Sequence, residues 1–268
     1  MSERRIRIAV SGAAGRMGNR IITLAGEQPN AFHVVAAIEQ GQSPYIGHDS
    51  GTLGTGRPNG IVIGTYPGDA VDVLIDFSAP SGTRTLVKAC VERGIGMVIG
   101  TTGLGAEDQK IIDNAAKSIA VLQATNTSLG INLLLGLAAQ VAARLGPAYD
   151  IEVMEAHHNQ KKDAPSGTAI SLVEAICAAT GRHYDAAVVN GRAGLDAQRQ
   201  TGSIGVHSVR MGDVIGEHTL FFATGGERLE FKHVATTRDT FVRGALRAAE
   251  FIAAQKAGRY TMANVLGL

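Results

Sequence analysis

Short aliphatic runs alternate with amphipathic segments through the first half of the chain. The aliphatic runs predict strands, and the amphipathic segments predict helices. Strands are expected at residues 6–10, 33–38, 73–77, 97–99 and 119–122, with helices at 16–25, 83–93 and 107–116. Apolar strands separated by helices are typical of parallel βαβ units whose sheet is covered on both faces. The glycine-rich stretch 41–68 shows no clear period, so we expect a loop there with one weak strand at 61–64.

The pattern changes after about residue 125. Helices are expected at 130–145 and 166–180, with strands at 150–156, 204–211, 217–223 and 228–235. Three strands in succession, grouped apart from the helices, indicate an α+β domain with a largely open, mixed sheet. A last amphipathic helix at 240–255 is expected to pack back on the first domain. The predicted fold class is therefore α/β, with a Rossmann-type parallel sheet domain followed by an α+β domain.

Charge and cysteine content narrow the function classes. The chain has 25 Lys+Arg and 24 Asp+Glu, a net charge of +1, which argues against a general nucleic-acid binder or a polybasic membrane module. Cys90 and Cys177 have no metal-ligand spacing, so we expect reduced thiols, no metal and a cytoplasmic location. The N-terminal residues lack the apolar region of a signal peptide. The apolar stretch 130–145 contains polar interruptions and falls short of the roughly 18 apolar residues of a membrane span.

Glycine is the unusual component, at 34 of 268 residues. Gly12, Gly15 and Gly18 lie between the first strand and the first helix in the spacing Gly-x-x-Gly-x-x-Gly. Such a turn lets the backbone approach a pyrophosphate, which the helix N-terminus then binds. Glu39 ends the second strand, at about the expected offset of 20 residues for a carboxylate that holds the adenosine ribose. The alternative for Glu39 is a solvated charge at a strand end.

The residue after Glu39 bears on the choice of nucleotide. An Arg at that position would bind the 2′-phosphate of NADPH, whereas Gln40 can only hydrogen-bond and Glu39 would repel the phosphate. Arg16, inside the turn, could compensate. We therefore expect NADH to be used at least as well as NADPH. Two further strand ends, 100–103 and 124–128, carry small hydroxyl residues that suit a nicotinamide and its ribose. Ordinary strand-end turns are the alternative for both.

The densest chemistry is Glu-Ala-His-His-Asn-Gln-Lys-Lys-Asp-Ala-Pro-Ser-Gly-Thr at 155–168. A strand leads in and a helix leads out, with Pro165 expected in the first helical turn and Asp163 or Ser166 as its cap. Free N–H groups at that helix start would bind a carboxylate. Metal binding is one alternative, disfavoured because adjacent strand residues point to opposite faces, and a solvated charged loop is another. The favoured interpretation is an anion site with a proton donor, since His titrates near neutrality and a Lys among other cations can be shifted toward it.

Four segments together resemble the bacterial dihydrodipicolinate reductase family, namely 12–18, 100–103, 155–168 and 216–219. The 155–168 segment is the specific one, and the resemblance covers about residues 8–251. It implies reduction of 4-hydroxy-tetrahydrodipicolinate (dihydrodipicolinate), a cyclic imine with two carboxylates, by NAD(P)H in lysine and diaminopimelate biosynthesis. It also implies a dinucleotide-binding domain at 1–127 completed by 240–268, and a substrate-binding and oligomerisation domain at 128–239 that forms a homotetramer, with hinge motion between them.

The resemblance assigns roles by position. His157 and Lys161 match the family's proton-donor residues, and His158, Gly167 and Thr168 match its substrate contacts. The matching nucleotide contacts are Gly12, Ala13, Ala14, Gly15, Arg16, Met17, Glu39, Gly100, Thr101, Thr102, Ala124, Thr125, Asn126 and Thr127. Two positions depart from the family: Gln40 stands where some members have Arg, and Thr127 where some have an aromatic residue.

The residues of the 155–168 segment and the resemblance together indicate a hydride transfer to a ring carbon conjugated with the imine. A proton then comes from Lys161 or His157, and the sequence does not decide between them. Lys162 is a further candidate for holding a carboxylate, whereas the Gly- and Arg-rich segment 192–212 is expected to be a mobile loop outside the site. Two other functions compete: a nucleotide sensor that binds NAD(H) without turnover, and a different oxidoreductase on the same scaffold.

Overall fold

The computed structural model describes residues 5–68 and 70–268, and these divide into two compact units. The first unit takes residues up to 129 together with 239–268, and the second takes 130–238. The division lies within two residues of the boundaries 127/128 and 239/240 expected from the sequence. Residues 1–4, on which the argument about a signal peptide rested, lie outside the described residues.

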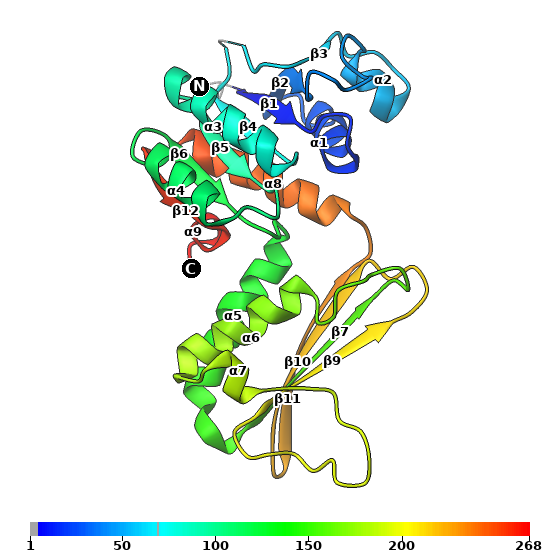
Figure 1. Cartoon of the computed structure of the whole chain (residues 1–268), viewed down its shortest axis with the longest axis vertical. Helices are drawn as coiled ribbons and strands as arrows, with labels where there is room; N and C mark the ends of the chain where they lie inside the picture. The colour runs from blue at the N-terminus through cyan, green and yellow to red at the C-terminus, as the bar shows by residue number, and fades with distance from the viewer. Residues whose placement is uncertain (1–4, 69) are drawn as a thin grey trace. The chain divides into compact units, whose positions relative to one another are not determined.

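The first unit is built on a seven-stranded parallel sheet in the order β12-β6-β5-β4-β1-β2-β3 (Figure 1). Its strands are β1 (Ile6–Ser11), β2 (Phe32–Ile38), β3 (Ile63–Gly64), β4 (Val73–Asp76), β5 (Gly96–Ile99), β6 (Ala120–Gln123) and β12 (Gly258–Tyr260). The order of the first six strands is that of a dinucleotide-binding doubly wound sheet. The predicted Rossmann-type domain is therefore confirmed.

Helices cover both faces of this sheet, as the continuous apolar character of its strands requires. α1 (Arg16–Gly26) and α8 (Asp239–Ala253) pack on one face, in a core that includes Ile8 and Val10. α3 (Pro80–Arg93) and α4 (Ala106–Ala115) pack on the other. Three short elements of this unit were not predicted: α2 (Ser50–Thr55), α9 (Met262–Leu266) and β12. Within the predicted loop 41–68, α2 forms because Asp49 caps it by accepting from the N–H groups of Gly51 and Thr52.

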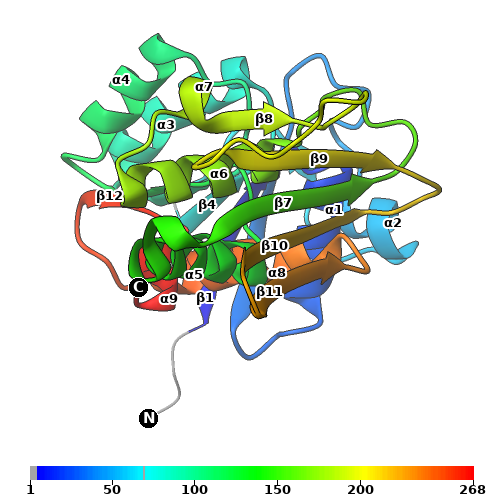
Figure 2. The same ribbon diagram turned by 90° about the horizontal axis from the view of Figure 1, so that it is seen from below.

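The second unit is a five-stranded mixed sheet in the order β11-β10-β7-β9-β8 (Figure 2). Its strands are β7 (Asp150–His157), β8 (Val188–Asn190), β9 (Ile204–Arg210), β10 (Gly216–Thr224) and β11 (Glu227–Ala235). β7 pairs parallel with β9 and antiparallel with β10. α5 (Leu129–Leu145) and α6 (Gly167–Thr180) share one core with the sheet, and a short helix, α7 (Tyr184–Ala187), follows α6. The expected α+β domain with a mixed sheet is confirmed.

Residues 129–148, α5 together with the 3-10 turn Gly146–Ala148, are long and apolar enough by length and composition to cross a membrane. A count of uninterrupted apolar residues predicts instead that this stretch is too short to cross a membrane. The same helix contributes Leu134, Ala138 and Ala142 to the core of the second unit. An apolar helix of this kind is also what a folded domain uses at its core.

Candidate active site

In the glycine turn after β1, backbone atoms pack so closely that no side chain fits at Gly12 or Gly18. Gly12 has a φ of 74°, and a Cβ there would lie 2.3 Å from the Phe77 carbonyl oxygen. A Cβ at Gly18, in the first turns of α1, would lie 2.1 Å from the Gly12 carbonyl oxygen. Backbone therefore packs directly on backbone at both positions, which only glycine allows. This is the close packing that a pyrophosphate-binding turn needs.

Glu39 lies beside this turn, at the end of β2. Its Oε1 accepts a hydrogen bond of 2.9 Å from the Ala14 N–H. A cavity of about 630 Å³ extends from the same place, lined by Ser11, Gly12, Ile38, Glu39, Gln40, Gly41, Thr65, Ser78, Ala79, Ser81, Gly82, Thr85 and Leu86. The closed turn, the carboxylate and the cavity fit the adenosine end of a dinucleotide. The sequence predicts a role for Glu39 at the adenosine end, but it gives no sign that α3 and its preceding loop line one side of this cavity.

The two hydroxyl-rich strand ends divide into buried and exposed positions. Thr101 is buried, and its hydroxyl donates to Asp76 Oδ2 at 3.0 Å and accepts from the Ser78 N–H. Thr127 is also buried and donates to the Phe241 carbonyl at 2.7 Å. Thr102 and Thr125 are exposed. The hydroxyls of Thr101 and Thr127 thus serve the fold, and only the exposed pair presents hydroxyls to solvent; the nucleotide contacts themselves stay a prediction.

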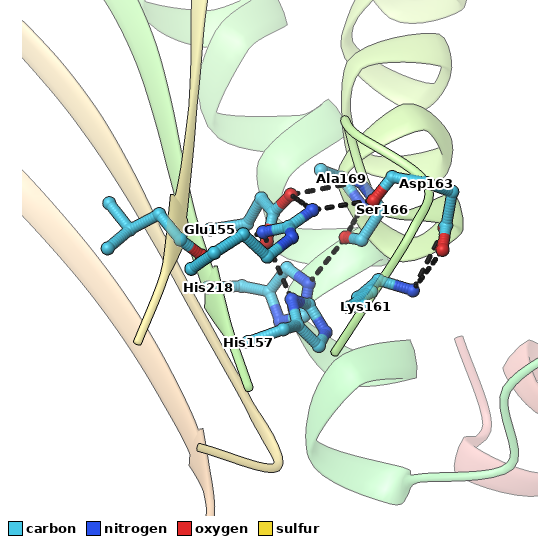
Figure 3. A network of polar contacts seen from close by, with 9 residues as sticks. Glu155, His157, Lys161, Asp163, Ser166, Ala169 and His218 are labelled. Atoms are coloured by element: carbon cyan, nitrogen blue, oxygen red, sulfur yellow. Dashed lines mark hydrogen bonds and ion pairs between the residues drawn. The ribbon is translucent and has the colours of Figure 1, made fainter. Parts of the chain in front are cut away.

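In the second unit, Glu155 is the centre of a polar cluster (Figure 3). Its carboxylate is 0% exposed. Arg210 donates to both of its oxygens, each at 2.9 Å, and the Ser166 N–H donates to Oε1 at 3.1 Å. Burial alone would raise the pKa of Glu155, but hydrogen bonds from Arg210, His157 and Ser208 lower it to about 2. Glu155 is consequently an anion at every physiological pH.

His157 lies on the same face of β7 as Glu155, two residues further along. Its Nδ1 is 2.6 Å from Glu155 Oε2, and its side chain is 12% exposed. Burial has the largest effect on the pKa of His157 and lowers it. The hydrogen bond and charge of Glu155 raise the pKa, and the positive charges of Lys161 and Arg210 lower it further. On balance the pKa of His157 lies below the ordinary value of a histidine, so the Glu155 carboxylate is the group that keeps the protonated imidazole accessible.

A second histidine, His218 on β10, packs against the first. The two rings are perpendicular, with centroids 5.3 Å apart. His218 Nε2 lies 3.1 Å from the Ser166 hydroxyl, which also accepts from the Ala169 N–H as the N-cap of α6. Burial, with the charge of His157, lowers the pKa of His218 to about 3. His218 is thus neutral and braces His157 against the start of α6.

Lys161 lies on the loop between β7 and α6, half-buried. Its ammonium donates to both oxygens of Asp163, at 2.8 and 2.9 Å. The Asp163 carbonyl accepts from Arg210 Nη2 at 2.6 Å. One guanidinium therefore connects the Glu155–His157 pair with the loop that carries Lys161. The charge-assisted hydrogen bonds of Arg210 hold Glu155 and the Asp163 backbone in place, whereas Lys161 is bound only by the exposed Asp163 carboxylate.

Several local predictions for this loop need correction. α6 begins at Gly167 with Ser166 as its cap, so Pro165 precedes the helix and does not lie in its first turn. Asp163 pairs with Lys161 and does not cap. Gly167 is exposed and Thr168 half-buried at the helix start, where amide groups remain outside the helical ladder.

Part of the segment 192–212 does not fit the prediction of a mobile loop outside the site. Its last part is β9, and Arg210 at the end of that strand binds Glu155. Arg192 and Arg199 both bind Glu152, at 2.8 Å each, on the other face of β7. Sequence reasoning left these arginines out because nothing in the sequence shows that β9 lies beside β7. The structure shows that β9 lies parallel to β7, in a register that pairs His157 with Arg210.

Comparison of the sequence with known protein families matches the chain to dihydrodipicolinate reductases. The model of the dihydrodipicolinate reductase N-terminus matches residues 6–127, and that of its C-terminus matches 130–266. A 4-hydroxy-tetrahydrodipicolinate reductase from Nitrosomonas eutropha is 46% identical over 267 residues, 98% of both chains. One from Alkalilimnicola ehrlichii is 44% identical over 98% of this chain and 99% of its own. A dipicolinate-bound dihydrodipicolinate reductase from Paenisporosarcina has the same fold, with a TM-score of 0.76 at 22% identity, covering 96% of this chain and 98% of its own.

A Rossmann-type sheet with its glycine turn, joined to a separate unit with a histidine and lysine cluster, defines an NAD(P)H-dependent oxidoreductase. More particularly, the chain belongs to the dihydrodipicolinate reductase family. Among the described residues, no group of three or more His, Cys, Asp or Glu side chains is arranged to hold a metal ion.

Proposed function

We propose that the chain reduces 4-hydroxy-tetrahydrodipicolinate to tetrahydrodipicolinate in lysine and diaminopimelate biosynthesis: the 4-hydroxyl leaves as water, and NAD(P)H supplies a hydride and the protein a proton. The observation that carries the proposal is the Glu155–His157–Lys161 cluster at the start of α6, in a chain 46% identical to a reductase of that name. A buried anion, a titratable imidazole and an ammonium beside helix amides suit a substrate that carries two carboxylates and must gain a proton.

The first unit holds the nucleotide. The turn Gly12–Gly18 receives the pyrophosphate, and Glu39 receives the adenosine ribose in the adjoining cavity. When bound, the reduced nicotinamide supplies a hydride. Thr102 and Thr125, the exposed hydroxyls of the two strand ends, are the side chains best suited to contact the nicotinamide half.

NADH serves at least as well as NADPH. Glu39 lines the cavity together with Gln40, so a 2′-phosphate there would meet a carboxylate and no guanidinium from that strand end. Gln40→Arg is expected to raise kcat/KM for NADPH relative to NADH by about tenfold, the effect of one added charge-assisted pair. Steady-state kinetics with both nucleotides check this, and a wild-type ratio strongly favouring NADPH would contradict it.

The second unit holds the dicarboxylate. The amides of Gly167 and Thr168 at the start of α6 bind one carboxylate, and His158 and Lys162 add hydrogen bonding and positive charge. His157 and Lys161 then lie on the segment that faces the reacting ring, where one of them donates a proton to the atom that gains negative charge. The positive charge of Lys161 lowers the pKa of His157, so the two groups influence each other.

Assembly and location complete the proposal. We expect a cytoplasmic homotetramer that binds neither nucleic acid nor membrane. The face of the five-stranded sheet away from α5 and α6 supports self-association, because Met154 and Val234 are 38% and 45% exposed there. Light scattering of the purified protein would report the tetramer directly.

One experiment distinguishes the proposed function from the two competing ones, a nucleotide sensor and a different oxidoreductase. Pyridine-2,6-dicarboxylate, a planar dicarboxylate that cannot be reduced by the enzyme, should inhibit turnover competitively with the substrate. A sensor would bind NADH and show no turnover to inhibit. A different oxidoreductase would reduce another carbonyl compound and ignore pyridine-2,6-dicarboxylate, and either outcome would overturn the proposed function.

A further inference from the structure

The proton of His157 has a definite position, because its partner cannot donate. Glu155 is fully buried and accepts from Arg210, the Ser166 N–H and His157. An ionised carboxylate only accepts hydrogen bonds. The 2.6 Å contact between Glu155 Oε2 and His157 Nδ1 therefore requires the proton on Nδ1.

The other ring nitrogen faces a space kept open by a glycine. A Cβ on Gly216, the first residue of β10, would lie 3.1 Å from His157 Nε2. Gly216 has no positive φ, so its backbone does not require glycine. The missing side chain instead leaves room beside Nε2. Behind the ring, His218 packs edge to face and is itself anchored to Ser166.

We propose that Glu155, held by Arg210, is the positioning residue for His157: it fixes the Nδ1–H tautomer and orients Nε2, beside Gly216, as the nitrogen that exchanges the proton with substrate. The proposal deepens the proposed function and rests on it. Arg210 carries the arrangement further, because its Nη2 also holds the Asp163 carbonyl, and the Asp163 carboxylate holds Lys161. One guanidinium thus contacts both the carboxylate that binds His157 and the loop residue that binds Lys161.

The charged and titratable groups around His157 determine what its pH dependence should be. Glu155 faces it from β7, Arg210 from β9, Lys161 from the following loop and neutral His218 from β10. Of these, only Glu155 stabilises the protonated imidazole. Removing that negative charge must make the imidazolium harder to form.

Glu155→Gln tests the proposal with a matched control on the same strand. Glu152→Gln removes a carboxylate that, like Glu155, binds arginine and histidine side chains, here Arg192, Arg199 and His207, but on the opposite face of β7. In Glu155→Gln, the basic limb of the kcat profile should move by about one to three pH units to lower pH. In Glu152→Gln it should stay in place. A shift in both variants, or in neither, would overturn the proposal.

Nitrogen NMR of isotope-labelled histidine gives a readout that needs no turnover. The His157 resonance, identified by its loss in His157→Asn, should show a protonated Nδ1 and an unprotonated Nε2 in the wild type and a tautomer mixture in Glu155→Gln. Glu155→Asp, which restores the charge, should recover the pH limb in part. Because the spectrum is independent of catalysis, an unchanged tautomer in folded Glu155→Gln refutes positioning even if the proposed function is correct. Conversely, the expected tautomer with no reduction of the substrate refutes only the function.

Discussion

The side chains of Lys161 and His157 are held in different ways. His157 is fixed on a strand by a buried carboxylate, whereas Lys161 sits on a loop and is held by Asp163, an exposed residue. An exposed ion pair is worth little and exchanges readily. Lys161 is consequently the candidate that can move from Asp163 to a substrate carboxylate or to the reacting atom, while His157 stays in place.

Lys161→Ala is expected to lower kcat by about 10²–10⁴-fold, the range for general acid catalysis. The Kd for NADH should not change, because the nucleotide turn belongs to the first unit. Lys162→Ala is the neighbouring control and should raise KM with little change in kcat, since it removes only charge near the carboxylates. Steady-state kinetics with NADH titration measure all three values. An unchanged kcat in Lys161→Ala would exclude Lys161 from proton transfer.

The residues of the site differ in how far the sequence could identify them. His157, His158 and Lys161 stand out because their chemistry is rare and they are close in sequence. Arg210 and His218 lie on other strands, and only the register of β9 and β10 against β7 brings them to His157. Glu155 could have been inferred, because residues two apart in a strand share a face. Its partner Arg210 could not.

At the scale of elements, the strands and helices of the nucleotide unit were predictable because each is a continuous apolar or amphipathic run. The elements that were missed are short. α2 depends on the Asp49 cap, and β12 is three residues at one edge of the sheet; the weak strand predicted at 61–64 is confirmed only as the two residues of β3 at the other edge. Runs this short carry no periodicity from which to infer them. Their pairing with β2 and β6 decides their conformation.

Two glycines of α1 give a matched test of the turn. Gly18→Ala would place a methyl group 2.1 Å from the Gly12 carbonyl oxygen, whereas a Cβ at Gly26, the last residue of the same helix, meets nothing within 4 Å. Gly18→Ala should lower the free energy of unfolding by about 1–3 kcal/mol and weaken NADH binding. Gly26→Ala should leave both values nearly unchanged or raise stability by up to about 1 kcal/mol. Urea denaturation and NADH titration measure the two effects, and equal behaviour of the variants would contradict this account of the turn.

For the whole molecule, the buried polar cluster makes stability depend on pH. The pKa of His218 falls from its ordinary 6.5 to about 3 in the folded chain, so its stabilising contribution is complete above pH 6.5 and is lost as pH falls toward 3. The pKa of Glu155 falls from 4.5 to about 2, so its contribution is lost only below about pH 4.5. Of these two groups, only His218 therefore acts between pH 6.5 and 4.5, and both act below pH 4.5.

His218→Gln separates these ranges. The free energy of unfolding of the wild type should fall between pH 6.5 and 4.5 more steeply than that of His218→Gln, since glutamine cannot take up a proton. Below pH 4.5 both proteins should also lose stability through Glu155, and the wild type should continue to lose more than His218→Gln until about pH 3. Urea denaturation across this pH range, at one protein concentration because assembly affects the midpoint, gives the comparison. Parallel curves above pH 4.5 would show that His218 is not buried as a neutral imidazole.

The central claim is that one chain joins a nucleotide unit to a dicarboxylate unit in order to reduce a cyclic imine. The most direct test is the absorbance of NADH after addition of the freshly formed product of dihydrodipicolinate synthase to the purified protein. The account predicts rapid NADH oxidation that stops when substrate is exhausted and is suppressed by pyridine-2,6-dicarboxylate. Tight NADH binding without oxidation would contradict it.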